Sequence, residues 1–301
     1  MRARLVQWVE SAASRDSKIV FLTGDLGYRI LEPLQTTLGG RFLNLGVAEA
    51  NLISVAAGLG SSGMKPFLYS ACPFVTLRCL EQIRNDLAFQ KISARIVGTG
   101  AGFTYGAQGP SHHALEDMQV VSAIPRVRIV NPGNAEELEY SLNRLEEVEE
   151  VVYFRLGKDR GARIERVKLG PAYRITEGKD VNLIVSGHVL GEAVEACQIL
   201  REKNVLVNLI SCPWVHPFPN EVVSSLLVPA PVVSLVEAYP GNPLENSMMR
   251  ILLEKPSHQG FLALHVQPQF APLAGSCDYL RRQAGIDSVS IAGRIEKFLF
   301  S

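Results

Sequence analysis

Residues 65–100 read "KPFLYSACPFVTLRCLEQIRNDLAFQKISARIVGTG", and this stretch decides the predicted fold. Residues 65–71 and 94–100 are short apolar runs of strand length, and residues 74–90 between them repeat their apolar side chains at helical spacing. A strand, a helix and a further strand in this order are typical of a parallel sheet whose two faces are covered by helices.

The alternation of strands and helices continues along the rest of the chain. A first series of predicted strands ends at residues 151–157, and a second series begins at residues 181–187. Residues 157–180 between them are rich in charged side chains and have no long periodic pattern, which indicates a linker, placed at residues 161–178. We therefore predict an α/β protein of two domains, residues 1–160 and 179–301, each a mostly parallel sheet flanked by helices.

The composition excludes several classes of function. The chain has 301 residues, is 47% hydrophobic and 20% charged, and has a mean hydropathy of +0.12, which suits a globular protein with substantial cores. Its 30 basic and 30 acidic residues balance, so no net charge favours a nucleic acid or an anionic membrane as partner. The first residues have no apolar signal-peptide core, and five cysteines without C-x-x-C spacing favour reduced thiols in the cytoplasm over a disulfide framework or zinc site.

One acidic residue lies among apolar neighbours in residues 43–52, "LNLGVAEANL". An unpaired buried carboxylate is costly, so Glu49 protonates, finds a partner, or lies on the solvated side of an amphipathic helix. This segment by itself favours the solvated position.

Two loops carry polar groups near the ends of predicted strands. "TGDLG" at residues 23–27 resembles part of a Gly-Asp-Gly…Asn-Asn motif for metal and diphosphate, but Leu26 and Leu52 replace two of its residues. We interpret Asp25 as capping a strand–helix turn and predict no metal ligands in this chain. The glycine-rich loop "GAGFTYGAQGPSHHALED", residues 100–117, lies where parallel sheets bind ligands; a flexible loop whose histidines cap the next helix is the alternative.

Taken in order, these motifs resemble the transketolase family over almost the whole chain. The segments similar to its pyrimidine-binding domain are residues 24–27, 43–70, 74–86, 106–138 and 152–157. Residues 181–218 are similar to its C-terminal domain. A full-length transketolase begins with a diphosphate-binding domain, and this chain starts where that domain would end. The resemblance therefore implies the C-terminal subunit of a split transketolase.

The resemblance also implies roles for individual residues. Glu49 corresponds to the glutamate that bonds nitrogen N1′ of the aminopyrimidine ring of thiamine diphosphate, so it is expected to be catalytic and cofactor-binding. Gly46 and Val47, which precede it in the same motif, are also expected to bind the cofactor. Phe74 corresponds to the aromatic residue that stacks on this ring, with a core phenylalanine as the alternative. His112 corresponds to the catalytic histidine that bonds the donor oxygen beside the reacting carbon.

The remaining candidates concern the sugar. Arg155 corresponds to an arginine that clasps a sugar phosphate, the alternative being a structural arginine that bonds carbonyls at a strand end. His113 is a further candidate next to His112. Gln108 stands where transketolases have an acid that reads a sugar hydroxyl, and Gly100 where they have a phosphate-binding histidine. We therefore expect an acceptor other than the ordinary aldose phosphates.

The function implied is a cytoplasmic transketolase that depends on thiamine diphosphate and Mg²⁺ and moves a two-carbon ketol unit from a ketose to an aldehyde. An N-terminal partner subunit is expected to supply the diphosphate and metal ligands in an α2β2 assembly. The alternatives are a carboligase like deoxyxylulose-phosphate synthase, the β subunit of a 2-oxoacid dehydrogenase, and a non-catalytic regulatory subunit. His188 and His216 match no family site, and we expect them at the surface or at an interface.

Overall fold

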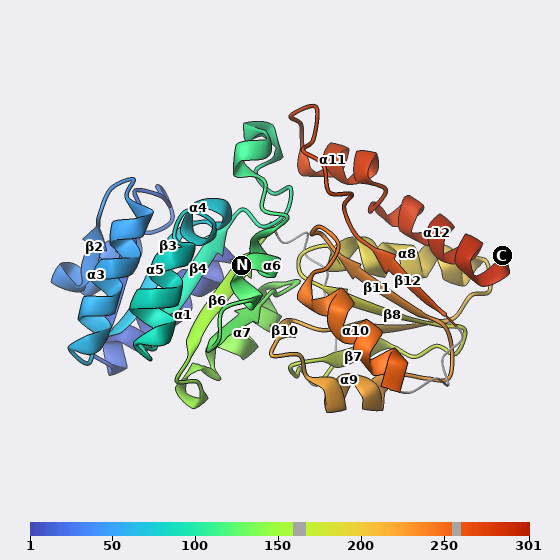
Figure 1. Ribbon diagram of the computed structural model, residues 1–301, viewed down its shortest axis with the longest axis horizontal. Helices are drawn as coiled ribbons and strands as arrows, with labels where there is room; N and C mark the ends of the chain where they lie inside the picture. Colours follow the sequence, from blue (N-terminus) through green and yellow to red (C-terminus); the bar gives the residue numbers. More distant parts are fainter. Residues whose placement is uncertain (159–166, 255–259) are drawn as a thin grey trace.

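The strands of the computed structural model, which describes residues 1–158, 167–254 and 260–301, form two sheets (Figure 1). The spatial order is β10-β5-β6-β4-β3-β1-β2 in the first sheet and β12-β11-β8-β9-β7 in the second. Neighbouring strands are parallel except β10 with β5 and β7 with β9. The predicted α/β architecture with two mostly parallel sheets is confirmed.

The strands of the first sheet are β1 (Ile19–Thr23), β2 (Phe42–Asn44), β3 (Lys65–Ala71), β4 (Arg95–Thr99), β5 (Val127–Val130), β6 (Val151–Leu156) and β10 (Trp214–His216). Those of the second sheet are β7 (Tyr173–Thr176), β8 (Val181–Ser186), β9 (Val207–Ser211), β11 (Val232–Val236) and β12 (Phe261–Leu264). The α-helices are α1 (Arg2–Arg15), α2 (Glu32–Leu38), α3 (Glu49–Ser61), α4 (Cys72–Thr76), α5 (Leu80–Gln82), α6 (Asp117–Ser122), α7 (Ala135–Leu142), α8 (Leu190–Glu202), α9 (Asn220–Leu226), α10 (Pro243–Glu254), α11 (Cys277–Ala284) and α12 (Ser288–Phe300).

The central strands are apolar along their whole length because helices cover both faces of each sheet. Helices α1, α2 and α7 pack on one face of the first sheet, and α3, α4 and α6 pack on the other. On the second sheet, α8 and α12 form one core layer, while α9 and α10 lie on the opposite face. The α3 side of the first sheet and the α10 side of the second share one continuous core, in which Met118 and Met248 are both fully buried. No helix in the described part of the chain is long and apolar enough to cross a membrane.

Two short strands do not follow the domain and linker boundaries predicted from the sequence. Strand β7 lies inside residues 161–178, which were predicted to be a linker, and forms an edge of the second sheet. Strand β10 lies in the predicted second domain, yet it completes the first sheet by pairing antiparallel to β5, and Trp214 donates a hydrogen bond to Ser141 Oγ at 3.1 Å. Both strands have only three or four residues, too few to produce a periodic pattern.

Candidate active site

Glu49 is the first residue of α3 and its side chain is buried, with 1% of the residue exposed. The preceding turn contains Gly46 at φ +73°, and Asn44 Oδ1 accepts the Gly46 N–H at 3.0 Å. A carboxylate at a helix N-terminus is favoured by the helix dipole. Ser70, at the end of β3, donates to Glu49 Oε1 at 3.0 Å. Glu49 is therefore not on the solvated side of α3, the position that the isolated segment favours.

Arg78 lies between Glu49 and Phe74. Its Nη1 donates to Glu49 Oε2 at 2.6 Å, and its Cζ lies 4.8 Å from the centroid of the Phe74 ring. The guanidinium is thus bonded to the carboxylate and placed over the aromatic ring at the same time. The Arg78 side chain is 49% exposed, so the arginine of this pair borders solvent while the carboxylate is buried. The sequence analysis did not identify Arg78, although it follows Phe74 by four residues in a predicted helix.

His112 approaches Phe74 from another side. Residues 106–112 form two short 3₁₀ turns, and the His112 ring meets the Phe74 ring edge-on at a centroid distance of 5.0 Å. Ser111 Oγ lies 3.1 Å from His112 Nδ1. Gln108 is exposed on the same loop. The structure therefore brings Glu49, Phe74 and His112 to one site, with Gln108 on the loop that carries His112.

The other predicted site residues lie elsewhere. Val47 is 73% exposed, on the surface just before α3. His113 is buried, with its ring edge-on to Phe103 and its Nε2 3.3 Å from the Gly106 carbonyl oxygen, and this burial lowers the pKa of His113. His113 therefore supports the loop from inside, whereas His112 faces the site.

Arg155 is enclosed by protein groups, a placement that favours the structural role over the phosphate-clasping one. It is fully buried in β6 and its Nε donates to Asp117 Oδ2 at 2.8 Å. Its Nη2 donates to the carbonyl oxygens of Ala114 and Glu237, at 2.5 and 3.0 Å. The guanidinium instead has the structural role that the sequence analysis kept as the alternative, because its neighbours already occupy its donors.

A groove of about 740 Å³ adjoins the base of the His112 loop. Gly100 and Tyr105 line it, and an added Cβ at Gly100 would lie 2.2 Å from the Tyr105 ring. Tyr105 therefore covers the position where the family has a histidine. The basic side chains in the lining are Arg2, Arg29 and Lys158, with Glu10 as the acidic one. Sequence analysis missed Lys158, which follows Arg155 by three residues and is exposed.

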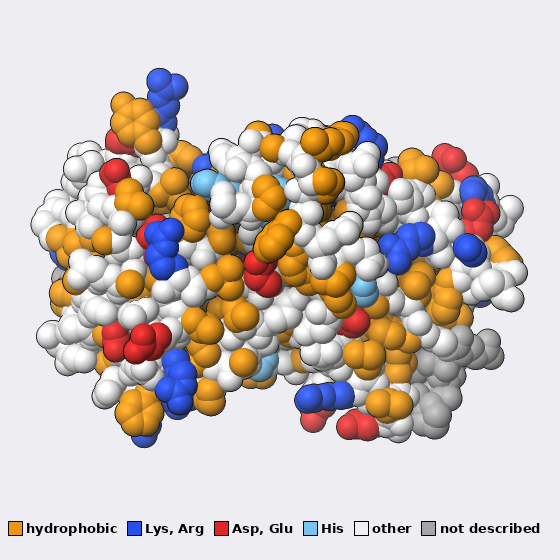
Figure 2. Space-filling model, turned by 45° about the horizontal axis from the view of Figure 1, so that its top comes forward, with side chains coloured by type: hydrophobic (Ala, Val, Ile, Leu, Met, Phe, Trp, Pro, Cys, Tyr) orange, Lys and Arg blue, Asp and Glu red, His pale blue; other side chains and the backbone are white. Residues whose placement is uncertain are grey.

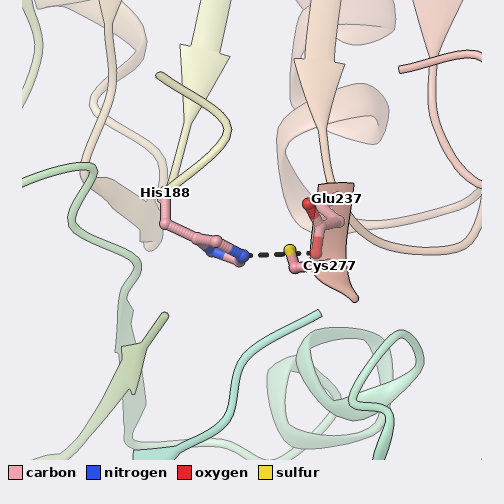
Figure 3. Close-up of side chains that lie close together, drawn as sticks. All are labelled: His188, Glu237 and Cys277. Atoms are coloured by element: carbon pink, nitrogen blue, oxygen red, sulfur yellow. Dashed lines mark hydrogen bonds and ion pairs between the residues drawn. The ribbon is translucent and has the colours of Figure 1, made fainter. Parts of the chain in front are cut away.

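His188, expected at the surface or an interface, is 1% exposed and lies between the two domains. Its Nε2 lies 3.2 Å from Glu237 Oε1, and Cys277 lies beside them (Figure 3). The potential ligand atoms of these three residues lie within 4.8 Å of one another. However, Arg281 Nε bonds Glu237 Oε2, and this buried positive charge opposes a metal ion at the same carboxylate. We interpret the cluster as a buried ion-pair network.

His216 lies on β10 and is partly exposed.

On the face of the molecule shown in Figure 2, hydrophobic side chains extend across the middle, and histidine side chains also reach the surface there. None of the five cysteines is joined to another by a disulfide bond.

Comparison with known proteins identifies the class. Residues 1–162 match the family described as "Transketolase, pyrimidine binding domain", and residues 170–249 match "Transketolase, C-terminal domain". The chain belongs to the transketolase family.

Its relatives place it among split enzymes of that family. It is 31% identical over 220 residues to a subunit of the apulose-4-phosphate transketolase of Phocaeicola vulgatus, covering 70% of each chain. It is 29% identical to "6-deoxy-6-sulfo-D-fructose transketolase subunit SqwH" of Clostridium sp., covering 74% of this chain and 71% of the relative. A solved structure described as "Split gene transketolase, inactive beta4 tetramer" superimposes with a TM-score of 0.88 at 25% identity, over 99% of this chain and 98% of that one. The chain is thus a transketolase-type transferase subunit that carries the pyrimidine-binding and C-terminal domains.

Proposed function

We propose that this chain binds the aminopyrimidine ring of thiamine diphosphate through Glu49 and Phe74. In the proposed assembly, a partner subunit holds the diphosphate and Mg²⁺, and the two chains together transfer a ketol unit from a ketose to an aldehyde. The observation that carries the proposal is the planar guanidinium of Arg78, bonded to Glu49 Oε2 and lying over Phe74.

The guanidinium of Arg78 occupies the place proposed for the aminopyrimidine ring, and this indicates that the ring would fit there. An aminopyrimidine ring is flat and carries nitrogen atoms that hydrogen bond, as a guanidinium does, so the same carboxylate and the same aromatic face suit both groups. Cofactor binding at this place requires Arg78 to swing away, and its half-exposed side chain has open solvent into which it can move. The Gly24 backbone lies beside the carboxylate, since an added Cβ would lie 3.6 Å from Glu49 Oε1 and 3.3 Å from Ser70 Oγ.

Each residue of the site then has a distinct task. When bound, thiamine diphosphate supplies the nucleophilic carbon of the reaction and an internal base on its aminopyrimidine. Glu49 would hydrogen bond to ring nitrogen N1′ of the bound cofactor and so favour one protonation form of the ring. Phe74 fixes the plane of the ring, and His112 hydrogen bonds to the oxygen of the donor next to the reacting carbon.

The sugar bound in the groove beside the His112 loop is proposed to be anionic. Three basic side chains and one acidic side chain line this groove. Two relatives act, by their names, on apulose 4-phosphate and 6-deoxy-6-sulfo-D-fructose, which are both anionic sugars. With Gln108 and Gly100 in place of the usual acid and histidine, the acceptor is still expected to differ from ordinary aldose phosphates. Gln108 accommodates a carbonyl or a differently placed hydroxyl because an amide both donates and accepts.

The assembly and location are part of the proposal. We expect an α2β2 heterotetramer with an N-terminal subunit of the diphosphate-binding type. A solved homologue consisting of β chains alone is described as inactive, which supports a need for the partner. Cysteines without disulfide bonds suit a reducing compartment, and we propose the cytoplasm.

The test is turnover with and without the partner. The purified chain with thiamine diphosphate and Mg²⁺ should not convert any ketose, whereas addition of the partner should restore ketol transfer. Ketose phosphates, ketose sulfonates and neutral ketoses should be compared as donors, with several aldehydes. Turnover by the single chain would contradict the partner requirement, and ribose 5-phosphate as the best acceptor would contradict the acceptor argument alone.

A carboligase is the second candidate, because the chain is 24% identical to "1-deoxy-D-xylulose-5-phosphate synthase" of Clostridium tetani over 96% of its length, covering 47% of that protein. Such an enzyme, like a 2-oxoacid dehydrogenase β subunit, would use a 2-oxoacid donor. Consumption of pyruvate in preference to every ketose would favour this class. A regulatory subunit would show neither reaction and no cofactor binding with its partner.

A further inference from the structure

We propose that Glu237 of the second domain is a positioning residue for catalysis: it holds the loop that carries His112 through the backbone N–H of Phe103. This inference rests on the proposed function, because it assigns to the loop the task of presenting His112 to the donor.

The loop is a closed unit. Gly102 and Ala114 form an antiparallel bridge at its base, with N–H to carbonyl distances of 2.9 and 3.0 Å. Between them the chain makes two 3₁₀ turns and brings His112 against Phe74. A shift at the base of the loop therefore moves His112 relative to the proposed cofactor site.

Glu237 contacts this base directly. It follows β11, is fully buried, and accepts the Phe103 N–H at Oε1 over 2.5 Å. Gly102, at φ +58°, makes the approach possible, because an added Cβ would lie 2.1 Å from Glu237 Oε1. The contact thus depends on a glycine in the first domain and a carboxylate in the second.

The carboxylate is itself held in place from the other side. Arg281 Nε donates to Glu237 Oε2, and Arg281 Nη1 donates to Glu192 Oε1 at 3.2 Å. Burial opposes ionisation of Glu237, but Arg281 and His188 outweigh it and lower the pKa of Glu237 below its usual value. An ionised carboxylate accepts from a backbone N–H more strongly than a neutral group. Glu237 is therefore a charged, immobile acceptor for the loop.

The second domain adds further anchors along the same loop. The Gly275 N–H donates to the Gly106 carbonyl oxygen at 3.2 Å, and the Tyr239 N–H donates to that of Leu115 at 2.8 Å. Phe103 and Leu115 also belong to the hydrophobic core of the second domain. In Figure 1 the loop stands beside the segment that leads into α11. The base of the loop is thus built into the second domain, while Gln108 and Ser111 at its outer end are exposed.

The test uses the assembled enzyme and Glu237→Asp. The shorter side chain keeps the charge that Arg281 requires but withdraws from the Phe103 N–H. Misplacement of His112 should lower kcat by on the order of 10- to 100-fold, with cofactor affinity unchanged. The decisive readout is a double-mutant cycle with His112→Ala. If Glu237 acts through His112, Glu237→Asp should change kcat by less than about twofold once His112 is absent.

Gly102→Ala is a second variant that perturbs the same contact from the loop, and Gly285→Ala is its matched control. Gly285 also has a positive φ, +66°, but an added Cβ there meets nothing within 4 Å. Gly102→Ala should reproduce the loss of kcat, and Gly285→Ala should retain wild-type kcat.

The possible outcomes separate the two claims. Equal losses from Glu237→Asp in the presence and absence of His112, or no loss at all, would overturn the positioning role. Failure of both Glu237→Asp and Gly102→Ala to assemble would overturn it too, since Glu237 would then serve folding alone. Full activity of His112→Ala would instead refute the role of His112 in the proposed function.

Discussion

Glu49 and Glu237 are both buried and each is paired with an arginine, and the two pairs differ in their access to water. Arg78, the partner of Glu49, has 49% of its side chain exposed. Arg281, the partner of Glu237, has 1% exposed and lies between two carboxylates. Both pairs join a carboxylate to a guanidinium. They differ in whether another molecule can reach the carboxylate and take the place of the arginine.

An arginine with open solvent beside it can leave its carboxylate at small cost, because its charge remains hydrated. A fully enclosed arginine cannot leave without placing unpaired charges in the protein interior. The Glu49–Arg78 pair, the open pair, is therefore suited to exchange its arginine for a ligand. The Glu237–Arg281 pair, the closed pair, is suited to fix the two domains to each other. Four measurements sharpen or break this comparison.

The largest effect is expected for the closed pair. Arg281→Met leaves Glu192 and Glu237 without their buried partner and should lower the free energy of unfolding by about 3–5 kcal/mol. Urea unfolding of the chain measures it. Lys203→Met is the control because it breaks an exposed ion pair with Glu296, and it should cost less than ~1 kcal/mol. Equal losses in the two variants would show that Arg281 is not structurally special.

The next effect concerns turnover at the open pair. Glu49→Gln, assayed with the partner subunit, should lower kcat by at least ~10²-fold, the scale of losing a positioned acid–base group. The chain should still fold, because Arg78 can turn into solvent; thermal unfolding checks this. Near-normal turnover would mean that another carboxylate serves the ring.

A smaller effect is expected when the open pair loses its arginine. Arg78→Ala leaves the buried Glu49 with Ser70 as its side-chain partner among the residues that the structure describes, which should cost about 1–2 kcal/mol in urea unfolding. The double variant Arg78→Ala/Glu49→Gln should recover most of this loss, because it removes the unpaired charge. No recovery in the double variant would argue that Arg78 contributes through packing on Phe74 alone.

The smallest effect is the pH dependence of stability that His188, a neighbour of the closed pair, produces. Burial lowers the pKa of His188 in the folded state from its ordinary value of 6.5, so below that pH the unfolded chain binds a proton that the folded chain does not. Stability should therefore fall as the pH falls through 6.5 and below. Glu237, whose pKa is also lowered from 4.5, continues the same trend at lower pH. His188→Gln should flatten the first part of the profile; an unchanged slope would exclude His188 as its source.

The same comparison explains how much could be predicted from the sequence. The fold was accessible because its strands and helices have strong local patterns. The group of Glu49, Phe74 and His112 came from the resemblance to the transketolase family, because the segment around Glu49 by itself favours a solvated position. The structural role of Arg155, kept as the alternative, could have been preferred from the sequence. Strand β6 reads as a continuous apolar run, the pattern of a strand buried on both faces, where a charged side chain needs an internal partner. Arg78 was accessible in principle, since residues four apart on a helix are neighbours.

The closed pair was not accessible in this way. The residues around this pair lie far apart in the sequence. Glu237 is 49 positions from His188 and 44 positions from Arg281. His188 and Glu237 follow different strands, and Arg281 lies on α11. Nothing in the local sequence of any of them predicts the others, because only the packing of the two domains brings them together. The sequence likewise could not show that Arg78 occupies the site proposed for the cofactor.

Strand β10 has a consequence for how genes of this kind can be rearranged. Residues 214–216 lie beyond the connection between the domains, yet they cover the edge strand β5 of the first sheet. A break in the reading frame between residues 158 and 167 would leave that edge with unpaired backbone groups, which promote aggregation. The pyrimidine-binding part is therefore not freely transferable on its own: in recombination, the two halves of this chain have to be inherited together.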